Sequence, residues 1–580
     1  MTDQNPTGGA NLTPLGKILT LGVIVLLIAA GAYVAFTKFG GGRKDNSPLT
    51  KMTAPPVESV DPTGITTVKE YKYVAADKLP EAKGASGYQW NNDSKILVFS
   101  YNVWAGWLPV IAANHGTEPN DESVFFKKYG FRVKMELIDD PVAARDAFVA
   151  GKVHTLWGTA DMMVLFAPEL MKDSRTAPRI VQQIDWSNGG DGILVRDSIK
   201  SVAQLKGKKI AYAANSPSEY YLTSLLLTAG LQPPRGNTGD IEAKVTDTAF
   251  GAATAMVSDK SIDGCVSWAP DIYTIPKKVP GTHLLSTTAD ANKLIADTYA
   301  VRADFMRDHP EIVEGLVAGI LEGMDIIKQN PKPACAAMAQ AFGGGMKQED
   351  VEGMMNDFHA TNFAENVQFF LNASNPTNFE RTWKNASYVY SELGRLDRIV
   401  PFDTVMDFRI IQKLQKEGKF AHQTDESVAA FTPGTYKKGN AEAVITQTIR
   451  INFYPNSSNP YELSRDEFGV AQQGKLYDPN VEKTMERVAQ LSGQFARATV
   501  LIKGHTDSSM KGQVSSQAVK DLSLARAEAI KQALIQKFKF DPNKFQVEGI
   551  GWDEPADPND PQNQALNRRV EISVLPTEQQ

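Results

Sequence analysis

The chain has 580 residues, a formal net charge of −6 and two cysteines. Its length predicts several domains rather than one. The mildly acidic balance argues against a nucleic-acid partner, and we expect none.

Residues 18–37 form an uncharged, mostly apolar run bounded by Lys17 and Lys38. A run of about 20 such residues is long enough to cross a bilayer as one helix. We therefore expect an N-terminal transmembrane helix after a short tail over residues 1–17. The alternative is a cleaved secretory signal, for which Ala30-Gly31-Ala32 offers a cleavage site. The apolar core of such signals is shorter, about 7–15 residues, so an uncleaved anchor is favoured.

Residues 38–93 are rich in Gly, Pro, Thr and Lys and have few apolar clusters, which predicts a flexible linker. From residue 94 to residue 431, strand-like and helix-like segments alternate, beginning with buried-type strands at residues 96–100 and 132–138. This alternation predicts an α/β fold in which helices cover both faces of a parallel sheet.

Two stretches of this region share one layout. Residues 143–161 and 251–271 each contain a helix pattern, a turn with Lys, a strand, and then a Trp followed shortly by an Asp. Two similar α/β lobes are the simplest explanation. Ligands of open α/β sheets bind beyond the carboxyl ends of the strands, so we expect a cleft where the strand ends of the two lobes face each other.

Five short motifs in this region occur in the order of a known family. They are NVWAGW at 102–107, GTAD at 158–161, DWSNGGDG at 185–192, LKGKKI at 205–210 and VSWAP at 266–270. They resemble the periplasmic solute-binding proteins of ABC importers for nitrate, sulfonates and taurine. The resemblance implies a type II periplasmic-binding-protein fold, with two lobes joined by two crossovers. We place the crossovers near residues 192–195 and 298–302 and expect the remaining helical part to pack on the first lobe.

Polar and aromatic residues after strand ends are the candidate ligand-binding residues of the cleft. They are Asn102, Trp104, Thr159, Asp161, Trp186, Ser187, Ser216, Ser218, Trp268 and Asp271. Rings with a few polar groups suit a small organic ligand better than a bare inorganic ion. Because Asp161 and Asp271 would repel a purely anionic ligand, we expect a zwitterionic or amine-bearing molecule. Trp107 and Trp383 are expected in the core.

The segment Ser216-Pro217-Ser218-Glu219 is a capping box with proline at the first helical position. Since a helix N-terminus attracts anions, it is a candidate seat for an acidic group of the ligand. The same motif caps many helices that bind nothing, so both interpretations stay open.

The sequence contains no metal-binding His spacing, nucleophile elbow or Walker loop. We expect no catalytic residues, no metal and no cofactor, and therefore no enzyme. His154 is expected to be structural. Cys265 and Cys335 could pair in an oxidising compartment, but buried free thiols are favoured.

After a second linker at residues 432–442, residues 443–580 predict a small α/β sandwich. Strands are expected at 444–453, 499–503, 545–550 and 570–574, because apolar residues alternate or run together there. One helix is expected to begin at Asp478-Pro479, and a second to be capped by Asp521 and to bury Leu524, Ala527, Ile530 and Leu534.

Three motifs in this part resemble the OmpA-like peptidoglycan-binding domain. They are GHTD at 504–507, LSLARA at 522–527 and NRRVEI at 567–572. The resemblance implies that Asp507 and Arg526 hold the diaminopimelate of the peptide stem, with Thr506, Asn567 and Arg568 as further contacts. An aspartate suits the ligand's ammonium group and a guanidinium grips its carboxylate. The loop after Asp507 is longer than usual, and Val519 stands where the family usually has Asn. The alternative is a structural Asp–Arg ion pair in a domain without a ligand.

A wall-binding domain requires the periplasm, although Lys38, Arg43 and Lys44 after the apolar run bias the topology weakly the other way. We expect a single-pass inner-membrane protein of a Gram-negative bacterium, with its tail cytoplasmic and its bulk periplasmic. Its expected partners are peptidoglycan, a small organic ligand, the lipid bilayer, and an ABC permease or another envelope protein. It would serve sensing or local capture of the solute. The alternative is a structural tether between inner membrane and wall, whose binding lobes are a spacer or docking module.

Overall fold

The computed structural model describes residues 58–575, except 60–64, 76–78, 237, 344–345, 427–442, 444 and 455, and it does not describe the side chains of residues 58 and 59. The expected tail at residues 1–17, the transmembrane segment at 18–37 and the linker at 432–442 lie outside the described residues. Among the described residues, no helix is long and apolar enough to cross a membrane.

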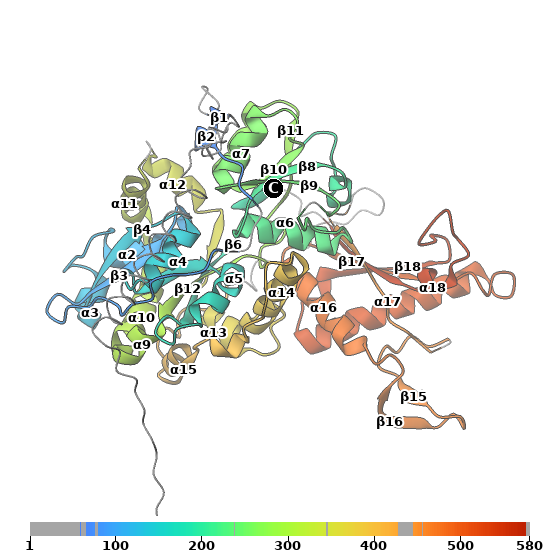
Figure 1. Ribbon diagram of the computed structural model, residues 1–580. Coiled ribbons are helices and arrows are strands. Elements are labelled where there is room, and N and C mark those ends of the chain that lie inside the picture. The colour runs from blue at the N-terminus through green and yellow to red at the C-terminus, as the bar shows by residue number, and fades with distance from the viewer. Residues whose placement is uncertain are drawn as a thin grey trace, which may run out of the picture. The chain divides into compact units, whose positions relative to one another are not determined.

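The first lobe is built on strands that run in the order β4, β3, β5, β12, β6, β13 (Figure 1). The hydroxyl of Ser100 on β3 donates to the Thr155 carbonyl on β5 at 2.8 Å, which joins the two parts of this sheet. The strands are β3 (Ile96–Tyr101), β4 (Arg132–Leu137), β5 (Thr155–Thr159), β6 (Pro178–Ser187), β12 (Ala296–Arg302) and β13 (Phe358–Ala360). Its first helices are η1 (Ala105–Trp107), α2 (Leu108–Asn114), α3 (Val124–Tyr129), α4 (Pro141–Val149) and α5 (Ala160–Leu170).

The second lobe has a five-stranded sheet in the order β11, β7, β10, β8, β9. Its strands are β7 (Asp191–Arg196), β8 (Lys209–Ala213), β9 (Glu242–Thr246), β10 (Gly264–Trp268) and β11 (Thr282–Thr287). Its helices are η2 (Val202–Leu205), α6 (Pro217–Thr228), α7 (Ala249–Ser258) and α8 (Asp271–Lys278). The predicted two-lobed α/β architecture is therefore confirmed, but the predicted parallel sheet is wrong. Both sheets are mixed, because the strands that follow the crossovers run antiparallel to their neighbours: β7 to β10 and β11, and β12 to β5 and β6.

The described strands pass from one lobe to the other at two places, from β6 to β7 and from β11 to β12. The crossovers therefore lie at residues 187–191 and 287–296, and both predicted positions were several residues too late. Residues 192–195 are inside β7 and residues 298–302 are inside β12. A run of apolar residues reveals a strand but not the point at which the chain changes sheets.

The helices that follow β12 pack largely on the first lobe, as expected. They are α9 (Ala303–Asp308), α10 (Pro310–Gln329), α11 (Lys332–Phe342), α12 (Gln348–Met354), α13 (Phe363–Leu371), α14 (Phe379–Glu392), η3 (Phe402–Thr404) and α15 (Arg409–Lys416). Helix α10 packs on α2 and α3, whereas α14 contacts both α5 and α6. Trp107 and Trp383 are fully buried, as predicted, and Cys265 and Cys335 are buried free thiols.

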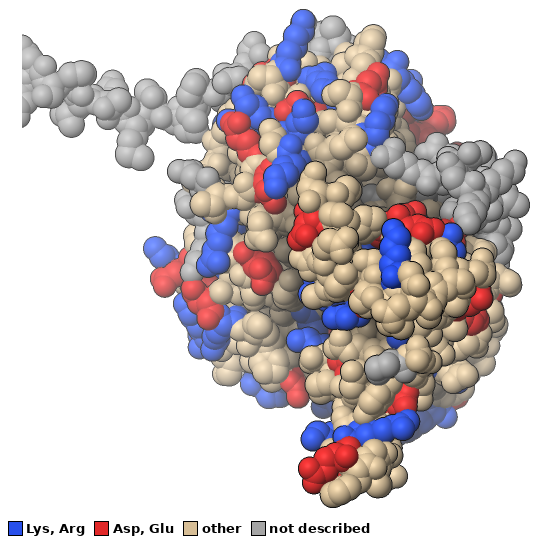
Figure 2. Space-filling view, turned by 90° about the vertical axis from the view of Figure 1, so that its right-hand side faces the viewer, with Lys and Arg blue, Asp and Glu red and all other residues tan. Residues whose placement is uncertain are grey.

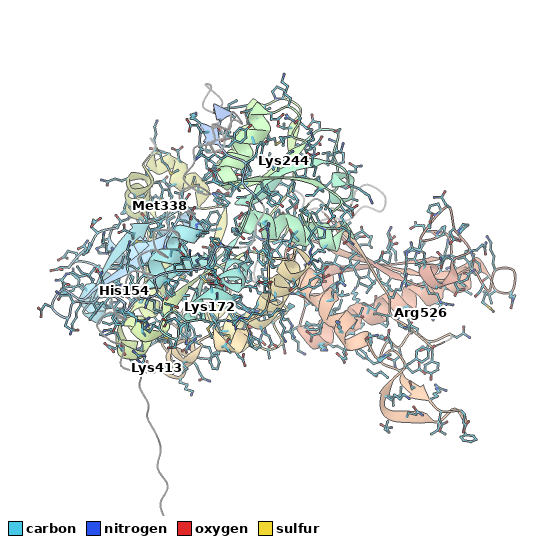
Figure 3. The ribbon with its side chains drawn as sticks, viewed as in Figure 1. His154, Lys172, Lys244, Met338, Lys413 and Arg526 are labelled. Atoms are coloured by element: carbon cyan, nitrogen blue, oxygen red, sulfur yellow. The ribbon has the colours of Figure 1, made fainter. Side chains whose placement is uncertain are left out.

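Part of the expected linker is packed on the lobes. Residues 65–75 lie on the second lobe, where Val74 N–H donates to the Val245 carbonyl and β1 (Glu58–Ser59) pairs with β2 (Glu70–Tyr71). Residues 79–93 lie on the first lobe, where the ring of His154 (Figure 3) contacts the Gln89 carbonyl at 2.8 Å. Burial lowers the pKa of His154 to about 4, and its ring holds this segment in place, as a structural residue does. We call residues 65–75 and 79–93 the strap.

The C-terminal domain is a four-stranded sheet in the order β14, β19, β17, β18, with helix α17 packed along β17 and β18 (Figure 1). Its elements are β14 (Ile445–Ile449), β15 (Leu463–Arg465), β16 (Ala471–Leu476), α16 (Val481–Gln494), β17 (Val500–His505), α17 (Ser516–Phe538), η4 (Pro542–Lys544), β18 (Phe545–Gly551), α18 (Gln564–Asn567) and β19 (Val570–Val574). The predicted small α/β sandwich is confirmed, with an additional hairpin, β15–β16.

Two predicted helix starts were wrong. Ser515, not Asp521, caps α17 by accepting from Ala518 N–H at 3.2 Å, so much of the expected long loop is helix. Leu524 is 40% exposed and lies off the buried face. Helix α16 follows Asn480, because the Asp478 carboxylate instead accepts from the backbone of Asn452 and Asn480. On the face that Figure 2 shows, Lys and Arg side chains are interspersed with Asp and Glu, without a large area of one sign.

Candidate functional site

A cavity lies between the two lobes. Its walls come from η1, the ends of β4 and β5, the crossover strands β7 and β12, and the N-terminal ends of α6 and α7. The space open to the centres of water molecules is about 60 Å³, a few times the minimum for one water. The arrangement therefore suits a small ligand, enclosed by both lobes.

Five of the ten predicted cleft residues line this cavity: Asn102, Trp104, Thr159, Ser216 and Trp268. The hydroxyl of Thr159 caps α5 by accepting from Met162 N–H at 3.4 Å. The amide oxygen of Asn102 accepts from the indole N–H of Trp107 at 2.8 Å. Trp268 keeps a buried indole N–H without a protein partner.

The other five predicted residues are held away from the cavity wall. Asp161 is buried and accepts from the Tyr390 hydroxyl at 3.0 Å. Asp271 accepts from the backbone and hydroxyl of Thr67 in the strap. Trp186 packs edge-on against Phe369. The two remaining residues are Ser187, which donates to Asp191 at 2.6 Å, and Ser218, which is fully buried in α6.

The carboxylates that line the cavity were not predicted. They are Asp139, Asp140, Asp191, Asp247 and Asp297. Their positions at strand ends could have pointed to them. Asp139 and Asp140 follow β4, and Asp247 follows β9. Asp191 and Asp297 stand at the start of β7 and β12, the strands that follow the two crossovers. Ten other residues were predicted on the same grounds, but these carboxylates were not.

The electrostatics of the cavity base are set by burial. Burial raises the pKa of Asp191 to about 7, against the hydrogen bond from Ser187. Burial also raises the pKa of Asp185 to about 7, against the hydrogen bond from the Trp104 indole. The pKa of Asp297 is well above its usual value because it is buried and lies against Asp185. Two carboxyl groups in contact favour sharing one proton.

The helix N-terminus at Ser216, the predicted site for an acidic ligand group, already has hydrogen-bond partners and a negative charge from the chain itself. The Ser216 hydroxyl donates to the Ala213 carbonyl at 2.8 Å. The Glu219 carboxylate, in the first turn of α6, accepts from Asn215 N–H at 2.9 Å and pairs with Arg395. The motif therefore acts here as a helix cap.

In the C-terminal domain, the motif residues lie close together but have internal partners. Asp507 accepts from Ser509 N–H and from Arg568 Nη1, each at 2.9 Å. Arg526 on α17 (Figure 3) donates from Nε to the Ser457 carbonyl at 3.0 Å, and its guanidinium lies 4.8 Å from the Phe453 ring centre. Burial lowers the pKa of Arg526, while the nearby Asp507 charge raises it.

The other motif residues of the C-terminal domain differ in how exposed their side chains are. Thr506 is nearly buried, and its hydroxyl has no protein partner. Asn567 holds the preceding loop through Ala556 N–H and the Pro561 carbonyl. The Arg568 side chain is 60% exposed. Val519, where the family usually has Asn, is 8% exposed, a buried residue of α17.

Two family models match the chain. Residues 121–334 match the NMT1/THI5-like model, and residues 471–569 match the OmpA family model. Outer membrane protein Omp38 of Acinetobacter baumannii strain ATCC 19606 is 34% identical over 99 residues, 17% of this chain and 26% of that protein. The taurine-binding periplasmic protein of Escherichia coli K12 is 25% identical over 141 residues, 24% of this chain and 42% of that protein. The chain thus spans less than half the length of these relatives.

Solved structures with similar folds include two binding proteins. The periplasmic aliphatic sulphonate-binding protein SsuA from Escherichia coli aligns with a TM-score of 0.41 and 17% identity, over 54% of this chain and 91% of that one. The periplasmic nitrate-binding protein NrtA from Synechocystis PCC 6803 aligns with a TM-score of 0.41 and 13% identity, over 58% of this chain and 92% of that one.

Proposed function

We propose that this chain, which joins an NMT1/THI5-like solute-binding domain to a C-terminal OmpA-family domain, binds a small organic solute and peptidoglycan at once. Both kinds of domain imply a location in the cell envelope. Residues 18–37 anchor the chain in the inner membrane, with the bulk in the periplasm. Held at both ends, it senses or locally captures its solute, with an ABC permease or another envelope protein as partner.

The observation that carries the solute-binding role is the cavity at the junction of the lobes. Residues from both lobes and both crossovers line it, so closure of the lobes would enclose a ligand. Among the described residues, no group of His, Cys, Asp and Glu could hold a metal.

Peptidoglycan binding is supported by the proximity of Asp507, Arg526 and Arg568. Their partners in the chain are backbone groups, a serine and each other. An ammonium group of the peptide stem would replace Arg568 at Asp507, and a stem carboxylate would take the guanidinium of Arg526 from the Ser457 carbonyl.

The test is co-sedimentation of the full-length chain with peptidoglycan that contains diaminopimelate. Asp507→Ala or Arg526→Ala should weaken binding about 10- to 100-fold, since hydrogen bonds to charged groups contribute about 1.5–3 kcal/mol. Arg450→Ala, which removes an exposed charge at the end of β14, is the control. Unchanged sedimentation of both site variants would refute the assignment.

The anchor and the cleft need separate tests. A reporter active only in the periplasm, fused after Gln580, should be active, and the protein should stay with the inner membrane after salt washing. Release of a shortened soluble chain would show a cleaved signal instead. Native mass spectrometry of the purified protein tests the cleft: a retained small molecule supports solute binding, whereas an empty cleft that no compound stabilises favours the tether.

A further inference from the structure

The ionisable side chains that line the cavity all carry the same sign. All five are aspartates, and no Lys, Arg or His is among the described residues of the wall. Such a wall repels anions and attracts cations, because electrostatic complementarity discriminates between ligands of opposite charge. The charge of the ligand can therefore be inferred from the wall.

Two of these carboxylates lie at the buried base of the cavity. Asp191 is 4% exposed and Asp297 is 7% exposed. Asp191 receives a hydrogen bond from the Ser187 hydroxyl, and Asp297 lies against the carboxyl of Asp185. A proton shared by Asp297 and Asp185 still leaves one negative charge on that pair, and a hydroxyl does not neutralise Asp191 once that group ionises. A buried charge without a counter-charge is costly.

The basic side chain that acts on the neighbouring Asp185 is already paired. His359 acts electrostatically on Asp185, but its ring contacts the Glu365 carboxylate. No protein cation thus balances Asp191 and Asp297 from within the wall.

Three indole rings complete the lining. Trp104 directly precedes η1, and Trp157 and Trp268 come from β5 and β10. Two are held by their N–H groups, Trp104 to Asp185 and Trp157 to the Ile138 carbonyl at 2.8 Å. Trp is the best aromatic partner for an organic cation, and quaternary ammonium sites in proteins are built from such rings.

The helix N-termini at the cavity offer little to an anion. In α6, Glu219 already supplies a negative charge to the first turn. In α7, the Thr248 hydroxyl accepts from Gly251 N–H at 2.9 Å, and Asp247 stands directly before it. An acidic ligand group at either end would meet a carboxylate of the chain.

We infer that the cleft takes a small organic cation, such as a protonated amine, an amidinium or a quaternary ammonium, held by Asp191 and Asp297 and enclosed by the three tryptophans. This inference rests on the proposed solute-binding function and specifies its ligand. Unlike the prediction from the sequence, it places no acidic ligand group at Ser216. It also assigns the carboxylates that hold the ligand to Asp191 and Asp297 instead of Asp161 and Asp271.

The test is the melting temperature of the full-length chain with probes matched in size, at fixed ionic strength. Choline, ethanolammonium and guanidinium are the cations, and 3,3-dimethyl-1-butanol is the uncharged counterpart of choline. Methanesulfonate, nitrate and taurine complete the set. At least one cation should raise the melting temperature, because ligands that bind the folded state stabilise it, and the neutral and sulfonate probes and nitrate should not.

Isosteric variants locate the charge. Asp297→Asn and Asp191→Asn should each weaken cation binding at least tenfold by calorimetry, whereas Asp93→Asn, an exposed charge outside the cavity, should change it less than twofold. Unchanged affinity in both cavity variants overturns the inference.

The remaining outcomes separate the inference from the proposed function. A shift with the neutral probe, nitrate or a sulfonate, and none with a cation, overturns the inference but leaves solute binding in place. If no probe shifts the melting temperature, native mass spectrometry decides: a retained cation supports the inference, a retained anion or neutral molecule overturns it, and an empty cleft overturns both.

Discussion

The carboxylates of the cleft and of the C-terminal domain have pKa values shifted in opposite directions, although burial acts on both in the same way. In the cleft, burial raises the pKa of Asp185, Asp191 and Asp357 to about 7. In the C-terminal domain, burial would also raise the pKa of Glu571, but the His505 ring, 3.6 Å from the carboxylate, and the hydrogen bond from Arg569 lower it to about 2. The same holds in direction for Asp507, where Ser509 and Arg568 outweigh burial.

The difference lies in where the positive charge comes from. The C-terminal domain supplies its own, since Arg569 lies 2.7 Å from Glu571 and Arg568 lies 2.9 Å from Asp507. The described wall of the cleft supplies none. A ligand therefore competes with internal partners at the first site and meets uncompensated acids at the second.

The largest expected effect is a fall in the stability of the ligand-free binding domain as the pH rises. A carboxyl group whose folded-state pKa is raised stabilises the fold fully below its unfolded pKa, near 4, and this is lost as the pH rises through about 7. Asp191 alone would contribute up to about 4 kcal/mol, at about 1.4 kcal/mol per pKa unit. The ionisable groups that act electrostatically on one another around the cavity base are Asp161, Asp185, Asp191, Asp297, Asp357 and His359.

Thermal unfolding of ligand-free protein at pH 5 and pH 8, at constant salt, measures this effect. The melting temperature of the binding domain should be lower at pH 8, and Asp191→Asn should flatten the dependence. A melting temperature that rises over this interval would contradict the assignment of uncompensated acids to the cleft.

Glu571→Gln should show the opposite pH dependence in the C-terminal domain. Removing the carboxylate that pairs with Arg569 should cost about 1.5–3 kcal/mol at pH 7. Because its pKa is lower in the folded state, the Glu571 carboxylate stabilises the fold at pH values above its unfolded pKa, near 4.5. This stabilisation is lost as the pH falls through about 2. Urea unfolding should thus show a difference from the native chain at pH 7 that shrinks towards pH 2, with exposed Glu467→Gln as the control. Equal loss at both pH values would exclude the ion-pair explanation.

Thr67→Val should have the smallest effect. It removes the hydroxyl that donates to Asp271 at 2.6 Å and should cost about 0.5–1.5 kcal/mol of stability. Calorimetry with a bound solute should give an unchanged affinity, because Asp271 faces the strap rather than the cavity. A tenfold loss of affinity would instead return Asp271 to the binding site.

Much of the fold could be predicted from local patterns. The alternation of strands and helices, the burial of Trp107 and Trp383, and the four strands of the C-terminal domain all leave a signal within one element. The packing of the strap and the β15–β16 hairpin could not be predicted in this way. A segment rich in Gly, Pro and Thr packs only through partners distant in sequence, such as Thr67 with Asp271.

Half of the residues proposed for the cleft line the cavity. Residues such as Trp104 and Thr159 follow strands and do reach the cavity, yet Asp161, only two positions after Thr159, turns into the protein towards Tyr390. On a helix, two positions separate opposite faces, and only the packing of α14 decides which face meets the core.

The sequence by itself determined that this chain carries two lobes of α/β structure and a C-terminal domain with motif residues at Asp507 and Arg526, since element periodicity and short motifs are local properties. The tertiary structure alone decided which charges meet. Asp191 and Asp297 are far apart in the chain and become neighbours at the cavity only because β7 and β12 each begin where a crossover ends. Contact between charges depends on how the strands are ordered in space, which no local pattern records.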